Sequence, residues 1–460
     1  RQFLAPMKGK NMKLQTLTTS ALLLAVASAG AWAKVAPTEA AKLGGELTLM
    51  GAEKAANKSG TIPSYTGGLK ADANADPMAD IFASEKPLFT ITAKNVDQYK
   101  AQLTDGQIAL FAKYPDTYKM PIYKTHRTAA YPKSIYDKAK SNAVTAELVS
   151  GGNGLVNFDE TIPFAIPKNG LEVIWNHVSR YRGGSIERNL ATIPVQLNGS
   201  FTAVKQRAQL TSPQYLKGGY DKKRDENILF YYTSSTKSPA RLTGNVLLVH
   251  ETIDQVEQPR MAWVYNAGQR RVRRAPQIAY DAPRQASEGL ATSDQVDMYN
   301  GAPRKYDWKL VGKTEIYIPY NSYKLADPAV KYSDIVQAGH IDQDLTRYEL
   351  HRVWKVEATL KEGERHVYGK RTFYVDEDSY QIAIADHYDN RDVLWRVSEG
   401  HALQFVNANA PWYVSTTNYD LLSGRYLVEL NNEENEPFKF GKQVKRKSFT
   451  AAALRRSGKR

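Results

Sequence analysis

The sequence of 460 residues contains no cysteine. This absence excludes disulfide bonds, zinc–thiolate sites, iron–sulfur clusters, cysteine nucleophiles and a lipid anchor on an N-terminal cysteine. Any functional site must therefore use oxygen atoms, nitrogen atoms or apolar surface. The chain is far above the length at which a single core becomes marginal, so it needs no cross-link to fold.

Long hydrophobic runs are also scarce. One short run, residues 21–30 (ALLLAVASAG), follows Met12 and Lys13, and no later window approaches the 18 uncharged apolar residues of a membrane span. The tripeptide Ala31-Trp32-Ala33 has the small-x-small pattern of a signal-peptidase site. We therefore predict a secretory signal over residues 1–33, cleaved after Ala33, and an exported protein.

Acidic residues are outnumbered by basic ones. The chain has 62 Lys+Arg against 48 Asp+Glu, a formal net charge of +14. An exported basic protein encounters anionic lipid headgroups rather than nucleic acid, so we expect no nucleic-acid partner. Peripheral contact with a membrane is an alternative that the charge allows. Tyrosine is in excess, 28 Tyr against 13 Phe, as is typical of half-wet β surfaces.

A period of two dominates the chain from about residue 200. It is clearest in residues 347–360 (RYELHRVWKVEATL), where the apolar residues share one face and most charged residues the other. Short turns such as Asn266-Ala267-Gly268 and Ser423-Gly424 separate further segments of this kind. We predict a mainly β fold with α (α+β): a large curled antiparallel sheet, or incomplete β-barrel, covered by helices.

The residues before the sheet differ in pattern. Residues 34–199 mix turn clusters with helical signals, including a capping box at Thr104 and Gln107. We expect residues 34–199 to form a helical, loop-rich arm and residues 200–460 the curled β domain with a basic tail, integrated into one domain over residues 34–460.

One helix of the arm has a clear apolar stripe. Leu171, Ile174, Trp175 and Val178 fall at i, i+3, i+4 and i+7. This stripe must lie on something apolar, so we expect the helix to form part of a lid over the sheet. His177 faces away from the stripe and is expected to face solvent.

Catalytic and metal motifs are largely missing. The spacing G-x-S-x-G does not occur, and the segment His250-Glu251-Thr252-Ile253-Asp254 resembles a zinc-protease helix but ends in Asp and lies in a strand-period region. Asp376, Glu377 and Asp378 lack the alternating ligands of a calcium loop, and we interpret them as a solvated hairpin tip. We expect no catalytic residues, no metal and no cofactor, although an enzyme acting on lipids or glycans remains an alternative.

The densest positive cluster consists of Arg270, Arg271, Arg273 and Arg274, directly after a turn. On a strand these side chains project to both faces. One interpretation is an exposed edge strand that charge protects from aggregation. The other is a contact with anionic headgroups or an acidic partner, because guanidinium groups bind phosphates in bidentate fashion.

Several segments together carry a resemblance to a known family. They are residues 163–177 (PFAIPKNGLEVIWNH), 180–183 (RYRG), 263–265 (WVY), 270–276 (RRVRRAP), 300–301 (NG), 306–310 (YDWKL) and 348–354 (YELHRVW). Over essentially the whole mature chain they resemble a proteobacterial family of periplasmic proteins of unknown function. The resemblance implies a fold similar to that of the outer-membrane lipoprotein-sorting carriers, whose incomplete β-barrel is closed by helices around an apolar cavity. It also implies a periplasmic location, and as partners a resistance-nodulation-division type exporter and an outer-membrane protein.

The leading hypothesis is a non-enzymatic periplasmic carrier for a lipid or other hydrophobic molecule. Its apolar wall is expected to be formed by Ile174, Trp175, Val178, Trp263, Tyr265, Tyr348, Leu350, Trp354, Val356 and Trp395. The arginine cluster at 270–274 would contact headgroups or a partner. Two alternatives stay open: the same aromatic face is a solidly packed core, and the protein is an interaction module that docks on a transporter or channel without cargo.

Overall fold

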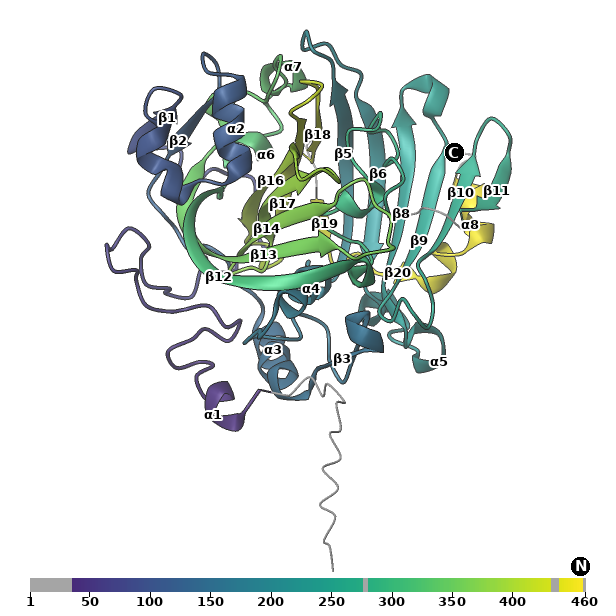
Figure 1. The fold of residues 1–460 in the computed structure, drawn as a ribbon. Helices are drawn as coiled ribbons and strands as arrows, with labels where there is room; N and C mark the ends of the chain where they lie inside the picture. Colours follow the sequence, from purple (N-terminus) through teal and green to yellow (C-terminus); the bar gives the residue numbers. More distant parts are fainter. Residues whose placement is uncertain (1–34, 276–279, 432–437, 458–460) are drawn as a thin grey trace, which may run out of the picture. The chain divides into compact units, whose positions relative to one another are not determined.

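One sheet of 16 strands organises the chain (Figure 1). The computed structural model describes residues 35–275, 280–431 and 438–457, so the predicted signal at residues 1–33 lies outside the described residues. The strand order is β1 (Phe89–Thr92), β2 (Lys119–Ile122), β13 (Tyr348–Leu360), β14 (Lys370–Asp376), β15 (Ile382–Tyr388), β16 (Leu394–Phe405), β17 (Ala410–Asp420), β18 (Tyr426–Leu430), β5 (Ser185–Val195), β6 (Val204–Thr211), β8 (Ile228–Ser238), β9 (Val246–Thr252), β10 (Met261–Asn266) and β11 (Arg271–Arg274).

Two further strands join this sheet beside the main path. β12 (Tyr306–Pro319) pairs with β13, and β19 (Phe438–Phe440) pairs with β5. Within this sheet the strand pairs are antiparallel except for the short contact of β2 with β13. The ends of the path do not pair with each other, so the sheet stays open, as the predicted incomplete barrel requires.

The sheet begins earlier in the chain than we predicted. β5 precedes residue 200, yet it lies in the middle of the strand order, between β18 and β6. The predicted arm therefore supplies the strand that joins the two halves of the sheet, which we call the β12–β18 half and the β5–β11 half. Two small sheets pair β3 (Glu147–Val149) with β4 (Gly154–Val156), and β7 (Leu216–Lys217) with β20 (Val444–Lys445).

The helices are few and mostly short. They are α1 (Pro37–Ala40), α2 (Asp105–Lys113), α3 (Lys133–Thr145), α4 (Gly170–Ser179), α5 (Lys222–Asp225), α6 (Tyr323–Ala326), α7 (Tyr332–Ile335) and α8 (Ala451–Ser457). The predicted capping box at the start of α2 is confirmed, because Thr104 and Gln107 exchange both hydrogen bonds. Among the described residues, no helix is both long and apolar enough to cross a membrane.

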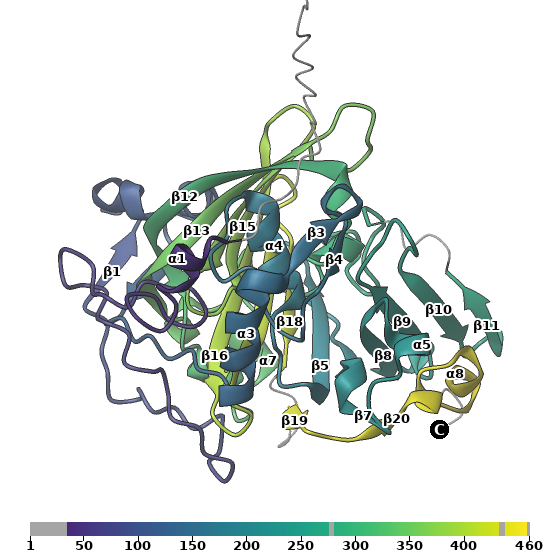
Figure 2. The same cartoon turned by 90° about the horizontal axis from the view of Figure 1, so that it is seen from below.

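Helix α4 is a core helix, and our prediction of a lid with one solvent-facing side is wrong. All ten of its residues are buried, and it contacts β12 and β13 (Figure 2). His177, which we expected to face solvent, is 0% exposed, with Nδ1 3.0 Å from the Tyr380 carbonyl oxygen and Nε2 2.8 Å from that of Asp297. Burial lowers the pKa of His177 well below its usual value, so the ring is neutral at pH 7.

A tight turn connects α4 to the sheet. Gly183 and Gly184 both have positive φ, 84° and 77°. A Cβ on Gly184 would lie 2.5 Å from the ring of Tyr215. Only glycine combines this left-handed conformation with such a close approach, and the turn lets β5 start directly beneath the end of α4.

The core is divided between the two faces of the sheet. The largest apolar cluster joins α2, α3 and α4 to the strands of the β12–β18 half. A separate cluster lies on one face of the β5–β11 half, where Phe449 and Leu454 cover Tyr231 and Leu248. α8 accordingly contacts β9, β10 and β11, as Figure 1 shows. The opposite face of the β5–β11 half is the hollow one.

Candidate functional site

A cavity of about 460 Å³, which we call the arginine cavity, lies on the hollow face of the β5–β11 half. Alternate residues of neighbouring strands point into it because side chains of one strand face have a period of two. The lining includes the apolar residues Leu190, Leu210, Phe230, Leu247, Val249, Val264 and Trp412, and also Tyr232. Residues 282–285, 293, 296, 297 and 300 form its cover.

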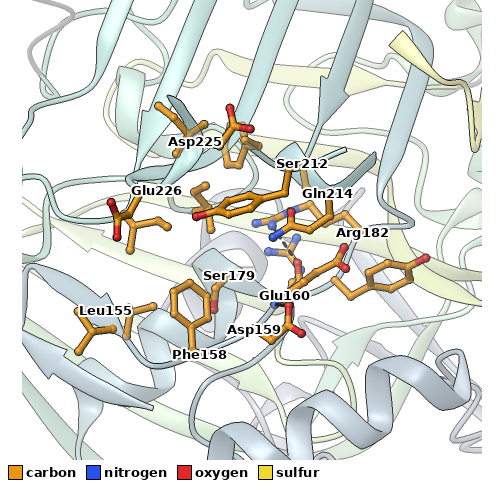
Figure 3. A pocket seen from close by; sticks show the side chains of 18 of the residues that line it. Leu155, Phe158, Asp159, Glu160, Ser179, Arg182, Ser212, Gln214, Asp225 and Glu226 are labelled. Carbon is orange, nitrogen blue, oxygen red and sulfur yellow. Dashed lines mark hydrogen bonds between the residues drawn. The ribbon is translucent and has the colours of Figure 1, made fainter. Parts of the chain in front are cut away.

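A second cavity of about 560 Å³, the acidic cavity, adjoins the first. Figure 3 shows its acidic side chains in two groups: Asp159 and Glu160 near Ser179, the last residue of α4, and Asp225 and Glu226 at the end of α5. The two cavities are neighbours because Arg182, Leu210 and Phe230 line both. They form two compartments along the same face of the sheet.

The cover of the arginine cavity is anchored by one carboxylate. Asp297 lies in the left-handed region, with φ 57°. It accepts hydrogen bonds from Arg180 Nη2 at 2.8 Å, from Arg182 Nη2 at 2.7 Å and from Trp412 Nε1 at 3.0 Å. Although burial raises it, Arg180 and Arg182 hold the pKa of Asp297 well below its usual range. The described segment around residues 282–300 is thereby fixed to the end of α4.

Two arginines of the cavity share a second carboxylate. Arg284 forms an ion pair with Glu429, and Arg188 Nη2 lies 3.7 Å from the other carboxylate oxygen. The side chains of Arg188 and Glu429 are 13% and 10% exposed. Burial and the neighbouring Arg188 lower the pKa of Arg284 to about 10, so Arg284 remains charged at pH 7.

Arg188 has hydrogen-bonding capacity to spare. Its guanidinium stacks on Trp412 at 5.0 Å and makes no hydrogen bond to any residue that the structure describes. An arginine carries five N–H donors. Because Arg188 lines the cavity, these donors are available to a bound molecule.

The third carboxylate of the lining has one cationic partner. Glu251 accepts from Arg260 Nε at 2.7 Å and from Asn300 Nδ2 at 2.9 Å. Asp297 is thus shared by two arginines, Glu429 is shared by two, and Glu251 has one. Among the described residues the arginine cavity therefore holds more positive than negative charge, inside a largely apolar wall.

Carboxylates, rather than arginines, are the prominent charged groups at the rim of the acidic cavity. Lys138 Nζ lies 3.3 Å from carboxylate oxygens of both Asp159 and Glu160, and Tyr215 donates its hydroxyl to Glu160 at 3.1 Å. Burial raises the pKa of Glu160. Asp225 is paired with Arg446. Lys138, Tyr215 and Arg446 thus pair with these carboxylates, and none of the three lines the cavity.

None of the ten residues predicted to form the ligand wall lines either cavity. Ile174, Trp175 and Val178 lie in the main core, where Trp175 donates its indole N–H to the Gly152 carbonyl oxygen at 2.8 Å. The predicted stripe is buried, but it packs against solid structure because side chains of β12 and β13 fill the space beneath α4.

The predicted wall residues of β13 and β16 are also packed. Tyr348 donates its hydroxyl to Glu399 at 3.1 Å, and Lys313 Nζ lies 4.6 Å from the ring centre of Trp354. Leu350 is buried, and Val356 belongs to the main core. Trp395 donates to Asp420 at 3.0 Å and stacks with Arg396. For these residues the packed-core alternative describes the structure.

Trp263 and Tyr265 lie on the wrong face of β10 for the predicted role. They pack in the cluster beneath α8, while Val264 between them points into the arginine cavity. Both faces of β10 are apolar, so alternation separates the two faces without showing which one is hollow. The prediction chose the face with the larger side chains, which is the filled one.

The four predicted headgroup arginines lie apart from the cavities. Arg270, Arg271, Arg273 and Arg274 are exposed, and β11 is the last strand of the sheet. The position is that of a charged edge strand. A contact with headgroups or a partner at this edge stays a prediction.

The arginine cavity contains charged residues that we did not predict from the sequence. Arg188 falls between Ile186 and Leu190 in the alternation of β5, so a charged residue occupies an apolar face. A charged residue among apolar ones on the same strand face could have identified Arg188 as a candidate site residue. Arg284 and Asp297 lie in a segment without periodicity, and no local pattern connects them to the sheet.

Comparisons with known proteins place the chain in a family. A profile described as a protein of unknown function, DUF1329, matches residues 90–455. The uncharacterized protein PA3922 of Pseudomonas aeruginosa is 57% identical over 449 residues, which cover 96% of this chain and 98% of that protein.

Two solved structures show weaker similarity. A DUF1329 family protein from Desulfovibrio piger is 15% identical and covers 59% of this chain and 91% of its own, with a TM-score of 0.41. A putative outer membrane lipoprotein-sorting protein domain from Vibrio parahaemolyticus is 13% identical and covers 62% and 98%, with a TM-score of 0.43. The match to the profile over most of the chain and the similarity to PA3922 show that this protein belongs to the DUF1329 family of unknown function.

Proposed function

We propose that this protein is a periplasmic binding or carrier protein for an amphiphile, a molecule with an apolar chain and an anionic headgroup. The observation that carries the proposal is the arginine cavity, where an apolar sheet face meets half-buried arginines that outnumber their carboxylate partners. Its volume of about 460 Å³ falls within the range of small-molecule sites.

The two parts of the cavity contribute differently to binding. Each methylene group moved from water onto the apolar wall supplies about 0.8 kcal/mol before ordering costs. The headgroup adds specificity, because hydrogen bonds to charged groups contribute about 1.5–3 kcal/mol. Arg188 supplies free donors for such an anion, and a negative headgroup would neutralise the charge excess around Glu429.

A carrier also needs a surface for the donor and the acceptor of its cargo. The exposed arginines of β11 are a supporting feature, since they form a basic edge away from the cavities. A membrane surface with anionic lipids, an exporter of the resistance-nodulation-division type and an outer-membrane protein are the partners included in this proposal.

The first test is native mass spectrometry of untagged protein purified gently from periplasm, followed by extraction and identification of bound molecules. We expect a stoichiometric amphiphile with an acidic group. A clean mass of the protein alone, which persists after incubation with envelope lipids, would reject the carrier and favour a module that docks through β11 without cargo.

A cavity-filling substitution tests the location. Val249→Trp places an indole into the arginine cavity and should abolish uptake of a fluorescent fatty acid. The matched control is Val311→Trp, which adds the same side chain at a residue 46% exposed outside the cavities. Equal uptake by the two folded variants would show that the cargo lies elsewhere.

The headgroup preference is tested with a fatty acid and a fatty alcohol of equal chain length. We expect the wild-type protein to bind the acid at least about tenfold more tightly, a difference of about 1.4 kcal/mol. Arg188→Leu should remove this preference, whereas Arg207→Leu, on the opposite face of β6 beside Glu187, should retain it. Equal affinities in the wild-type protein would retain the carrier and refute the anionic headgroup.

A further inference from the structure

Outside both cavities, three buried side chains bring possible metal ligands together. His351 on β13, Asp376 at the end of β14 and Asp378 in the following turn each offer one ligand atom, all within 4.8 Å of one another. The interpretation of residues 376–378 as a solvated hairpin tip is wrong, because they are 1%, 2% and 4% exposed. Arg127 and Arg352 cover the turn and bind Glu377.

The hydrogen bonds around His351 fix which ring nitrogen carries the proton. Nε2 lies 3.2 Å from Glu349 Oε2. Glu349 Oε1 accepts from Arg347 Nε at 2.6 Å and from Asn321 Nδ2 at 3.0 Å. A carboxylate that is ion-paired with an arginine accepts hydrogen bonds and donates none, so Nε2 is the N–H donor and Nδ1 presents a lone pair.

That lone pair faces a second acceptor. Asp376 Oδ1 lies 4.0 Å from His351 Nδ1 and has no hydrogen-bond partner among the residues that the structure describes. Asp376 Oδ2, in contrast, accepts from the Ser379 backbone N–H at 3.0 Å and from its hydroxyl at 2.6 Å. Two buried acceptors thus face each other with no donor between them, an arrangement that costs free energy unless something positive fills the gap.

Asp378 completes the group and is held in place from behind. Arg127 donates to both of its carboxylate oxygens, from Nε at 2.8 Å and from Nη2 at 2.7 Å. Each oxygen keeps a second lone pair. Glu377 is paired with Arg127, Arg352 and Lys313, whereas no arginine or lysine that the structure describes forms an ion pair with Asp376. Asp376 is therefore the acid of this turn that lacks a strong cationic partner.

We propose that His351 Nδ1, Asp376 Oδ1 and one carboxylate oxygen of Asp378 bind a divalent transition-metal ion, for which Zn²⁺ is the probe. An imidazole nitrogen with two carboxylate oxygens is a donor set that suits Zn²⁺. The Glu349–His351 contact is the outer hydrogen bond that commonly orients a metal-bound histidine. Metal–ligand bonds of about 2.0–2.2 Å place tetrahedral ligands about 3.4 Å apart. His351 Nδ1 and Asp376 Oδ1, now 4.0 Å apart, would therefore approach by roughly 0.6 Å, and no pair of the three atoms by more than about 1.4 Å.

Such an ion would join parts that are distant in the sequence. It would tie β13 to the turn between β14 and β15 and, through Arg127, to the segment that follows β2. The metal would therefore stabilise the β12–β18 half. This inference does not depend on the proposed cargo, since none of the three ligand residues lines either cavity.

The test uses untagged wild-type protein, stripped with a chelator and dialysed, then titrated with Zn²⁺ alone by isothermal calorimetry. We expect one ion per chain with a dissociation constant below about 1 µM, a rise of a few degrees in Tm, and retention of the ion through gel filtration. Weaker or non-stoichiometric binding by the wild-type protein would overturn the proposal and leave a water molecule as the occupant of the gap.

Variants locate the ion. Asp376→Asn keeps the shape of the side chain and should weaken Zn²⁺ binding at least 100-fold, as should His351→Gln. The matched control is His340→Gln, which removes another buried histidine, one whose two ring nitrogens have protein partners. One tightly bound equivalent in folded Asp376→Asn protein would refute the assignment, even if His351→Gln fails to fold.

Discussion

The two halves of the sheet have similar strands, but one half is covered by a packed helix and the other encloses a cavity. In the β12–β18 half, the inner face meets a helix, α4, in which every residue is buried. In the β5–β11 half, the corresponding face is covered by an irregular segment around residues 282–300, and a cavity of about 460 Å³ remains. A helix presents a continuous row of side chains that fills the space between two layers, whereas a loop pinned at a few points does not.

The difference also extends to electrostatics. In the hollow half, Arg180 and Arg182 share Asp297 and hold its pKa well below its usual range, so this carboxylate stays ionised. The packed half contains Glu399, which is 0% exposed and whose pKa burial raises to about 7. A solid core can hold a neutral carboxylic acid, and a cavity lined by charge is suited to a charged guest.

The largest expected effect comes from emptying the packed half. Trp175→Ala removes a side chain that is 1% exposed and hydrogen-bonded to Gly152. We expect the free energy of unfolding to fall by about 3–5 kcal/mol, measured by urea denaturation. A loss below about 1 kcal/mol would mean that α4 packs loosely and that the contrast between the halves is false.

The next effect is a pH dependence located in the packed half. The pKa of Glu399 in the folded protein is about 7, above its usual value. Between pH 4.5 and 7 the folded protein therefore binds a proton that the unfolded chain releases. The free energy of unfolding falls as pH rises through this range. Glu399→Gln should remove this part of the fall, on the order of 3 kcal/mol. Thermal unfolding at pH 5 and pH 8 measures it. Asp386, whose pKa burial also raises to about 7, should contribute to the fall that remains.

A smaller effect is expected from an aromatic residue of the hollow half. Phe230 is 8% exposed but borders both cavities, so its ring already lacks neighbours on one side. Phe230→Ala should cost about 1–2 kcal/mol, less than the usual cost of deleting a core aromatic residue. Denaturation of this variant beside Trp175→Ala gives the comparison directly. Equal losses would show that the cavity is well filled in solution.

The smallest effect on stability is expected at the edge of the hollow half. Arg271→Thr combined with Arg273→Thr changes exposed side chains, so the free energy of unfolding should stay within about 0.5 kcal/mol. If the charges protect the edge strand, light scattering should detect self-association of the variant at high concentration. An unchanged monomer would favour the partner-binding interpretation of these arginines.

The sequence allowed us to predict the sheet but not its contents. Alternation in residues 347–360 correctly indicated β13, and the capping box at Thr104 correctly placed the start of α2. The same alternation could not show which face of β10 is hollow, because Trp263 and Val264 are both apolar. Arg284 and Asp297 meet β5 and α4 only through long-range folding. Such pairs leave no local signal in one sequence.

The position of Phe449 and α8 has a consequence for the outer face of the β5–β11 half. Phe449 and Leu454 cover this face at β8 and β9. Removing residues 449–457 would uncover Leu248 and Tyr231, which are both buried in the intact protein. The apolar surface exposed in this way would favour self-association of the truncated protein.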